Sequence, residues 1–433
     1  MNRRRTAAMI VAGLALFVLL PSVAATPVSA AEGFSFGAVG DNGADGAEDP
    51  GDATSRTLQL IGREHPAFVQ SLGDLAYDPS AAADVHDGAD WCKWTSAQIA
   101  RTSDGETVPY IIAAGNHEAQ DAKAGFAIED YTAAPSCADP FASVTSFPTD
   151  AATDAAKDSF YDYPADQPLL RVININPGLD YRSDGVRDYS RGSTMYRWVQ
   201  SAIAGAKAKQ EWVVLTYHVA YLNAGSDHGA DMSTGYYAPT ASQFGDIFAL
   251  ATRMKVDLIL NGHEHNYQRS RQLRLSDACP TILHDRYEQA CTTDADGSAA
   301  APYARGGGPV QLIIGTGGHR PSGVNEADGD RGYMIVADAG ADNCGYVSFA
   351  VSAAVLAGTF RNACDGTLAD SFIIEGDPTT DPTAGPSPTP APSESTAPSG
   401  RLPFGTSVGG AIAVGGLIVV IVVATIVLVR RRR

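Results

Sequence analysis

Up to about residue 305, short apolar runs alternate with longer amphipathic stretches along the chain. The short runs favour buried strands, and they lie at residues 34–40, 68–72, 108–113, 169–175, 212–216 and 256–260. Apolar positions at helical spacing mark residues 54–64, 193–207 and 244–254, with Ser193 as the N-cap of the second helix. Strands and helices in alternation predict an α/β body.

Beyond residue 305 the pattern changes, because strand-like runs follow one another without helical stretches between them. These runs lie at residues 310–314, 333–337, 346–350, 355–360 and 372–374. Consecutive strands joined by short turns are typical of antiparallel sheet. We therefore expect the second half of the body to add mostly antiparallel strands.

The first thirty residues have the three parts of a secretory signal peptide. Arg3–Arg5 form a charged start, residues 7–20 an apolar stretch, and residues 21–31 a region of small side chains. We expect residues 1–30 to be removed on export. An uncleaved N-terminal anchor is the alternative reading.

The other end of the chain has the features of a membrane anchor. Residues 408–429 form an uncharged apolar run of about 33 Å as a helix, enough to cross a bilayer. The arginines at 430–433 predict a cytoplasmic tail, since basic residues stay on that side. The Pro-, Ser- and Thr-rich residues 377–407 predict a stalk, which places the body, residues 31–376, on the extracellular face of the cell membrane. A cell-wall sorting signal is the alternative for this end.

Composition and charge narrow the classes of partner. With 44% hydrophobic and 18% charged residues, the chain can bury a sizeable core, which excludes wholesale disorder. The formal net charge is -18, from 49 acidic against 31 basic residues, and seven of the bases lie at the two chain ends. The body is therefore more acidic still, so we expect no nucleic acid partner. A phosphorylated substrate stays possible where a metal ion supplies positive charge.

Cysteine usage agrees with export. The chain has six cysteines, and an even number in an exported protein suggests disulfides, although six allow fifteen pairings. We expect the sequence neighbours Cys279 with Cys291 and Cys344 with Cys364 to pair. The sequence has no Cys-x-x-Cys spacing, which argues against a zinc–thiolate site.

Polar residues that can carry chemistry follow five of the predicted strands. Ligands bind at the carboxyl ends of strands in α/β sheets, so side chains placed there project into a shared crevice. His263 and His265 alternate on a segment expected to be extended, so both should face one side. The five segments are Gly40-Asp41-Asn42-Gly43, Gly73-Asp74-Leu75-Ala76-Tyr77, Gly115-Asn116-His117-Glu118, His218 and Gly262-His263-Glu264-His265.

Taken together, these segments supply a set of metal ligands. Carboxylate, amide and phenol oxygens and imidazole nitrogens suit first-row metal ions. Seven such residues are too many for one tetrahedral ion and suit two ions that share a bridging carboxylate. The seven are Asp41, Asp74, Tyr77, Asn116, His218, His263 and His265.

The five segments, in this order, resemble the motifs of the calcineurin-like metallophosphoesterases, and within them the purple acid phosphatases. The first segment lacks the histidine of the common Asp-x-His, and Tyr77 in the second segment takes its place, as in the purple acid phosphatases. The stretch Gly262–Arg269 and the turn Gly315–Gly318 also fit that family. The resemblance implies a four-layer sandwich of two mixed β-sheets flanked by helices.

The resemblance also implies roles for the seven ligands. A ferric ion would bind Asp41, Tyr77 and His265. A divalent ion, which could be zinc, manganese or iron, would bind Asn116, His218 and His263, and Asp74 would bridge the two ions. A metal-bound hydroxide would then attack phosphorus.

A leaving alkoxide needs a proton, and two histidines could donate it. His117 follows the ligand Asn116, and His228 lies ten residues after His218, a spacing that the family also uses. An ordinary surface loop is the alternative for His228. We expect Glu118 to support the ligands from behind and Glu264 to point away from the metals.

These observations predict an exported, membrane-tethered phosphatase that hydrolyses phosphate monoesters of small molecules. The same dimetal site could instead serve a phosphodiesterase or a nucleotide hydrolase. The alternative from another class is a non-enzymatic surface protein on a stalk, which the intact ligand set disfavours.

Overall fold

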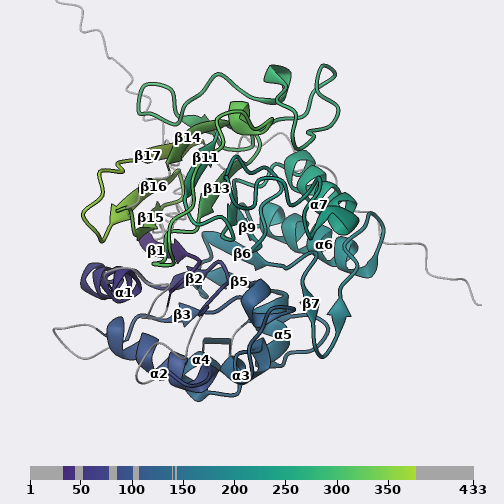
Figure 1. Ribbon diagram of the computed structural model, residues 1–433. Helices are drawn as coiled ribbons and strands as arrows, with labels where there is room; N and C mark the ends of the chain where they lie inside the picture. The colour runs from purple at the N-terminus through teal and green to yellow at the C-terminus, as the bar shows by residue number, and fades with distance from the viewer. Residues whose placement is uncertain are drawn as a thin grey trace, which may run out of the picture. The chain divides into compact units, whose positions relative to one another are not determined.

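The computed structural model describes residues 33–43, 52–77, 85–100, 107–138, 140–141, 144–338, 340 and 342–376 (Figure 1). They all belong to the first of two units of the chain, which spans Met1–Gly385. The predicted signal peptide, stalk and transmembrane segment lie outside the described residues. Among the helices of the described part, none is long and apolar enough to cross a membrane.

One sheet has seven strands in the order β12-β17-β16-β15-β1-β2-β3. Strands β1, β2 and β3 are parallel, while β15 joins β1 antiparallel and continues with β16 and β17 as an antiparallel meander. The bounds are β1 Phe34–Val39, β2 Val69–Ser71, β3 Tyr110–Ile111, β12 Tyr303–Ala304, β15 Gly345–Val351, β16 Val355–Asn362 and β17 Ser371–Glu375.

The second sheet has eight strands in the order β14-β11-β13-β10-β9-β6-β5-β4. Its centre, β6, β9, β10 and β13, is parallel, and antiparallel strands flank it on both sides. The bounds are β4 Thr145–Ser146, β5 Ser159–Tyr163, β6 Leu170–Asn174, β9 Trp212–Thr216, β10 Leu258–Asn261, β11 Tyr267–Ser270, β13 Val310–Ile314 and β14 Met334–Asp338. A separate two-stranded ribbon pairs β7 Asp180–Tyr181 with β8 Gly185–Val186.

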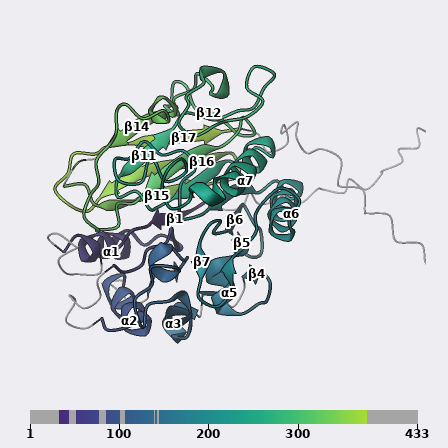
Figure 2. The same ribbon diagram turned by 45° about the vertical axis from the view of Figure 1, so that its right-hand side comes forward.

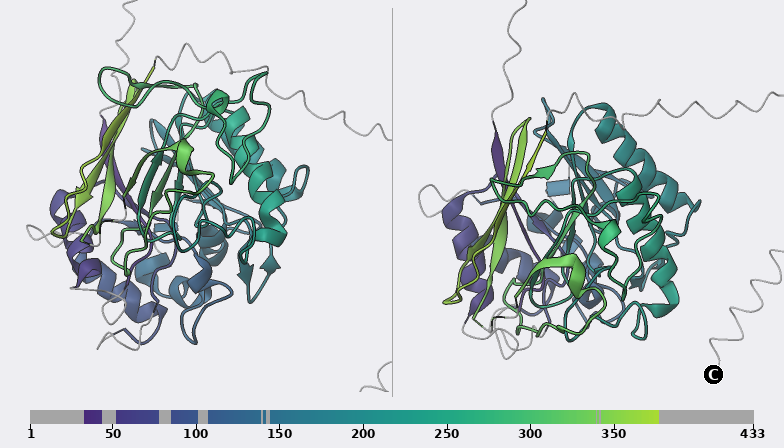
Figure 3. Two further views of the ribbon diagram at one scale, coloured as in Figure 1. Left: turned by 45° about the horizontal axis from the view of Figure 1, so that its top comes forward. Right: turned by 90° about the horizontal axis from the view of Figure 1, so that it is seen from above.

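The two sheets face each other, and helices cover their outer faces (Figure 2). Helix α1 packs against the seven-stranded sheet, while α6 and α7 lie outside the eight-stranded sheet (Figure 3). The side chain of Ser193 accepts a hydrogen bond from the Tyr196 backbone N–H and so caps α6, as predicted. The helices are α1 Ala53–Glu64, α2 Gly88–Gln98, α3 Ile128–Thr132, α4 Pro135–Ala138, α5 Ala152–Lys157, α6 Thr194–Ala208 and α7 Ala241–Arg253.

Aromatic side chains join the inner faces of the sheets. The Phe68 ring, just before β2, meets the Tyr161 ring of β5 edge-on at 5.6 Å between centroids. The Tyr161 hydroxyl also donates a hydrogen bond of 2.8 Å to Oε1 of Gln70 in β2. Buried aromatic pairs and satisfied polar groups of this kind set the relative position of the two layers.

The α/β body with two mixed sheets and helices confirms the prediction from the hydrophobic pattern. The pattern predicts neither β5, β11 nor α2, and of the run at residues 108–113 only Tyr110–Ile111 forms a strand. Both expected disulfides, Cys279–Cys291 and Cys344–Cys364, are present. A third, Cys92–Cys137, links α2 to α4.

Candidate metal centre

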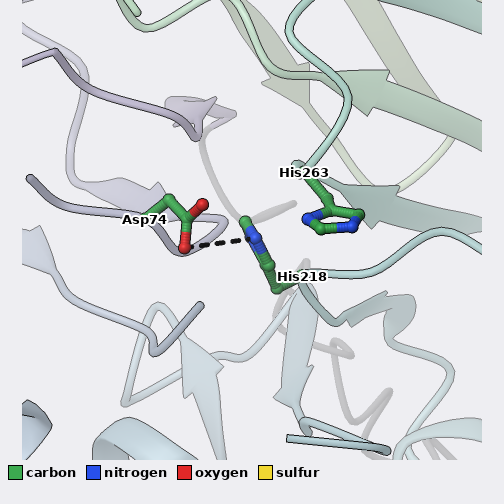
Figure 4. Close-up of side chains that lie close together, drawn as sticks. All are labelled: Asp74, His218 and His263. Atoms are coloured by element: carbon green, nitrogen blue, oxygen red, sulfur yellow. Dashed lines mark ion pairs between the residues drawn. The ribbon is translucent and has the colours of Figure 1, made fainter. Parts of the chain in front are cut away.

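The seven predicted ligands converge where strands of both sheets end. In the seven-stranded sheet, Asp41 follows β1, Asp74 and Tyr77 follow β2, and Asn116 follows β3. From the eight-stranded sheet, His218 follows β9, while His263 and His265 follow β10. Figure 4 shows the side chain of His218 between those of Asp74 and His263. Ligand atoms of these three residues all lie within 4.8 Å of one another.

The backbone at three of the ligands is left-handed, which is uncommon outside glycine. The φ angles are 64° at Asp41, 51° at Asp74 and 72° at His263. The segment that carries His263 and His265 is therefore a turn, and the expectation of an extended segment is wrong. Both histidines still reach the same site, because the turn and not strand alternation directs them. Strained residues of this kind are held by their surroundings and cluster at functional sites.

Two glycines allow the ligand loops to approach one another. A Cβ atom on Gly115 would lie 2.1 Å from Oδ1 of Asp74, and one on Gly73 would lie 2.6 Å from Nδ1 of His218. Neither contact is possible for a real side chain, and Gly73 also has a φ of 92°. The glycines in the motifs are thus required for the convergence of Asp74 and His218.

Asn116, His218 and His263 place three acceptor atoms face to face. Oδ1 of Asn116 lies 3.0 Å from Nε2 of His218 and 3.1 Å from Nδ1 of His263. Nδ1 of His218 donates to the Leu72 carbonyl at 2.8 Å, so the neutral imidazole carries its lone pair on Nε2. Nδ2 of Asn116 donates to Oδ2 of Asp121 at 3.0 Å, which turns Oδ1 inward.

The same argument holds for His263. Its Nε2 donates to Oδ2 of Asp231 at 2.8 Å, which leaves the lone pair on Nδ1. With both imidazoles neutral, three lone pairs therefore point at one spot. A cation satisfies such an arrangement, and the oxygen and nitrogen donors suit a first-row divalent ion.

Asp41, Tyr77 and His265 form the other half of the site, and Tyr77 contacts both of the other two. Its phenolic oxygen lies 2.8 Å from Oδ1 of Asp41, 2.8 Å from Oδ2 of Asp74 and 2.9 Å from Nε2 of His265. The second carboxylate oxygen of Asp74, Oδ1, lies 3.3 Å from Nε2 of His218. Asp74 thus presents one oxygen to each half, which is the position of a bridging ligand.

The electrostatics of the site also favour bound cations. Burial raises the pKa of Tyr77 well above its usual value, and the charges of Asp41 and Asp74 raise it further. Burial, reinforced by the charge of Asp74, raises the pKa of Asp41 to about 7. Burial opposes protonation of His218, but the charges of Asp74 and Asp41 outweigh it and raise the pKa to about 9. A cation would reverse these shifts by stabilising the deprotonated groups.

Glu118 supports the ligand loops and Glu264 points away from the ligands, as the sequence predicts. Glu118 is buried, and its carboxylate accepts hydrogen bonds from the backbone N–H groups of Gly115 at 2.9 Å and Leu75 at 2.8 Å. Glu264 points away from the seven ligands and accepts from Nδ2 of Asn223 at 3.1 Å and the His228 N–H at 2.9 Å. Both therefore order the ligand loops from behind.

The two proposed proton donors border the ligand set on different sides. The His117 backbone N–H donates to Oδ1 of Asp74 at 3.0 Å, and its ring centroid lies 4.2 Å from that of Tyr77. The His228 ring lies 4.1 Å from the ring of His263. Both side chains are half-buried and therefore partly accessible to solvent.

Sequence reasoning missed Asp231 and gave His319 no role. Asp231 accepts from His263 and also lies 3.2 Å from Nδ1 of His228, so it orients a predicted ligand and a predicted proton donor. It belongs to a turn-rich loop without periodicity, and the sequence offers no signal for it. Nδ1 of His319 lies 2.9 Å from Nδ1 of His265. Its place next to the turn Gly315–Gly318 is the signal that singles it out in the sequence, although the sequence alone assigns it no contact.

Several known proteins are similar to this chain in sequence. Relatives include an uncharacterised protein of Mycobacterium tuberculosis, 28% identical over 222 residues (49% of this chain and 36% of the relative). Probable inactive purple acid phosphatase 1 of Arabidopsis thaliana is 25% identical over 274 residues, covering 63% of this chain and 38% of the relative. A nucleotide pyrophosphatase/phosphodiesterase of Hordeum vulgare is 22% identical over 244 residues, covering 54% and 58%.

A solved structure shares the fold. The purple acid phosphatase PPD1 from yellow lupin (Lupinus luteus) superimposes with a TM-score of 0.53 at 21% identity, covering 80% of this chain and 54% of that one. The chain spans well under half the length of the Mycobacterium and Arabidopsis relatives. The family model for calcineurin-like phosphoesterases matches residues 34–267, more than half of the chain. The chain therefore belongs to the calcineurin-like phosphoesterase family and is similar, within it, to the purple acid phosphatases.

Proposed function

We propose that the protein is a dimetal phosphatase that hydrolyses phosphate monoesters of small molecules, in the manner of a purple acid phosphatase. The observation that carries the proposal is the convergence of Oδ1 of Asn116, Nε2 of His218 and Nδ1 of His263, the atoms that the outer hydrogen bonds of these side chains leave for a cation. Asp74 beside them has its other carboxylate oxygen on Tyr77, which makes a second cation site next to the first.

The chain's residues divide between the two ions by chemistry. Asp41, Tyr77 and His265 offer a carboxylate, a phenol and an imidazole, which suit a hard ferric ion. Asn116, His218 and His263 offer neutral oxygen and nitrogen donors, which suit zinc, manganese or ferrous iron. Bound ions would supply an activated water and neutralise the phosphoryl oxygens of the substrate.

His117 and His228 are the proposed sources of the proton for the leaving oxygen. Nδ1 of His228 lies 3.2 Å from the Asp231 carboxylate, which holds a hydrogen there, so the imidazolium form of His228 would donate its second proton from Nε2. The main chain of His117 is fixed by its hydrogen bond to Asp74, and its ring lies beside the ring of Tyr77. Donors held in this way protonate a leaving alkoxide as it departs.

A phosphodiesterase or nucleotide hydrolase is the second candidate. The observation that favours it is the similarity to the barley protein named nucleotide pyrophosphatase/phosphodiesterase. The names of several plant relatives include the words probable inactive. The complete set of converging ligands supports an active enzyme here.

The full-length protein, purified in detergent, is expected to hold two metal ions per chain, one of them iron, and to absorb visible light. We also expect a higher kcat/KM for an aryl phosphate monoester than for the matched diester or a dinucleotide pyrophosphate. Metal analysis, a visible spectrum and initial rates on the three substrates check this. A higher kcat/KM for the diester or the pyrophosphate would favour the second candidate instead.

The Tyr77→Phe variant is the control for the ferric ion in the same experiment. It should lose the visible band, because the band arises from charge transfer between the phenolate and iron. A band that persists in the variant contradicts the assignment of Tyr77. A colourless, iron-free and active wild type contradicts the ferric ion but not the phosphatase.

We further propose that the protein is exported and held on the extracellular face of the cell membrane. Three disulfides in the described residues support export, since disulfides persist in oxidising compartments. Intact cells should hydrolyse a membrane-impermeant aryl phosphate, and deletion of residues 408–433 should release the activity into the medium. Activity found only after cell lysis, or unaffected in location by the deletion, would contradict this proposal.

A further inference from the structure

His319 is held against the Tyr77 half of the candidate metal centre by its backbone. It lies in the loop after β13, where its N–H donates to the Asp41 carbonyl at 3.0 Å. The N–H of Gly317 donates to the Gly40 carbonyl at 2.9 Å in the same loop. These main-chain hydrogen bonds hold the loop along the end of β1 and keep the backbone of His319 next to Asp41.

The His319 ring touches two of the three ligands of that half. Its centroid lies 3.7 Å from that of Tyr77, with 31° between the ring planes. Its Nδ1 lies 2.9 Å from Nδ1 of His265, a hydrogen-bond distance. One of these two nitrogens must carry the hydrogen, and the other must accept it.

The other nitrogen of His265 decides which one donates. Nε2 of His265 faces the Tyr77 oxygen at 2.9 Å and Oδ1 of Asp41 at 3.7 Å, inside the ligand set. A neutral imidazole that offers a lone pair at Nε2 carries its hydrogen at Nδ1. Nδ1 of His265 then donates, and Nδ1 of His319 accepts.

The other two ligand histidines have the same arrangement. The distal nitrogen of His218 donates to the Leu72 carbonyl, and that of His263 donates to the Asp231 carboxylate. His265 has His319 in the corresponding place. Each ligand histidine thus has its own acceptor, which is the usual way in which a protein fixes the tautomer of a metal-bound imidazole.

We propose that His319 is a positioning residue for the Tyr77 half of the site, where it accepts the Nδ1 hydrogen of His265. It thereby keeps the Nε2 lone pair of His265 directed at the cation. The proposal rests on the proposed function in that it takes Asp41, Tyr77 and His265 as metal ligands. It adds a residue to the site that lies outside the five strand-end segments.

The test separates the hydrogen bond from the ring contact with Tyr77. His319→Phe keeps an aromatic ring on Tyr77 and removes the acceptor, while His319→Asn places Oδ1 near the former Nδ1 and removes the ring. Metal-depleted full-length protein is titrated with zinc in a chelator-buffered series, and the occupancy of each site is measured. His86→Phe, at an exposed histidine before α2, is the matched control.

Wild type and His86→Phe should bind two zinc ions. His319→Phe should weaken one site about 10- to 100-fold, the usual effect of removing the partner of a ligand histidine, and His319→Asn should weaken it less than tenfold. Equal affinities in wild type and His319→Phe would overturn the proposal. A loss in His319→Asn as large as in His319→Phe would also overturn it, because the ring and not the acceptor would then matter. If His319→Phe does not fold, His319→Leu removes the acceptor in its place.

This measurement does not depend on catalysis. A protein that binds two zinc ions and hydrolyses no phosphate ester would contradict the proposed function and leave the role of His319 standing. Conversely, an active enzyme in which His319→Phe binds zinc like wild type contradicts only the role of His319. A wild type without zinc sites contradicts both.

Discussion

Replacing Asp74 by asparagine is expected to lower kcat/KM at least about 10³-fold, because several kcal/mol of metal-ion stabilisation of the transition state depend on this carboxylate. Its two oxygens face different halves of the ligand set, one beside Tyr77 and one beside His218. The substitution keeps the size of the side chain and removes the charge that both cations would share. Initial rates with an aryl phosphate and metal analysis of the variant measure the two effects.

Asp277→Asn is the matched control, since it makes the same chemical change at an exposed aspartate. It should keep wild-type rates and metal content. If Asp74→Asn kept two ions and more than a tenth of the activity, Asp74 would not bridge the ions, and its assignment as the shared ligand would have to be abandoned.

Replacing Asp370 by alanine is expected to lower the free energy of unfolding by about 3–5 kcal/mol, because it leaves a buried charge unpaired. Arg269 in β11 binds Asp370 through two hydrogen bonds, from Nε at 2.7 Å and from Nη2 at 2.8 Å. Their side chains are only 5% and 7% exposed. Because Asp370 lies just before β17, the pair also joins the two sheets. Urea denaturation monitored by circular dichroism measures the change.

Asp365→Ala is the control for a surface ion pair. Asp365 is 91% exposed and lies 3.6 Å from Arg56, so its removal should change the free energy of unfolding by less than about 1 kcal/mol. Similar losses in Asp365→Ala and Asp370→Ala would show that the buried pair adds no more than a surface pair.

The ligand set could be predicted because short sequence segments contain both the ligand side chains and the strands that position them. Asp41, Asp74 and His218 each follow a buried apolar run, and parallel strands bring their carboxyl ends together. The apolar runs also identify most of the strands. The local hydrophobic pattern is sufficient to predict where a residue lies when the preceding strand determines its position.

Other parts of the fold and the site depend on contacts that no local pattern records. Strand β11 is fully buried yet polar, and its side chains are satisfied by partners such as Asp370, far away in the sequence. Asp231 and His319 reach the ligands from loops, through contacts with His263 and His265. The left-handed backbone of His263 is likewise imposed by its surroundings, since a positive φ is uncommon for any residue other than glycine.

The location of the ligand set at the meeting of the two sheets has a thermodynamic consequence. Each half of the ligand set contains residues from both sheets. His265, from the eight-stranded sheet, lies with Asp41 and Tyr77 from the seven-stranded sheet. Asn116, from the seven-stranded sheet, lies with His218 and His263 from the eight-stranded sheet. Any cation bound there would cross-link the layers and bind only while they are docked. Folding and metal uptake are then linked equilibria, and at a free-ion concentration a hundred times Kd each ion adds about 2.7 kcal/mol to the free energy of unfolding. The stability of this sandwich would therefore vary with the metal supply of its compartment.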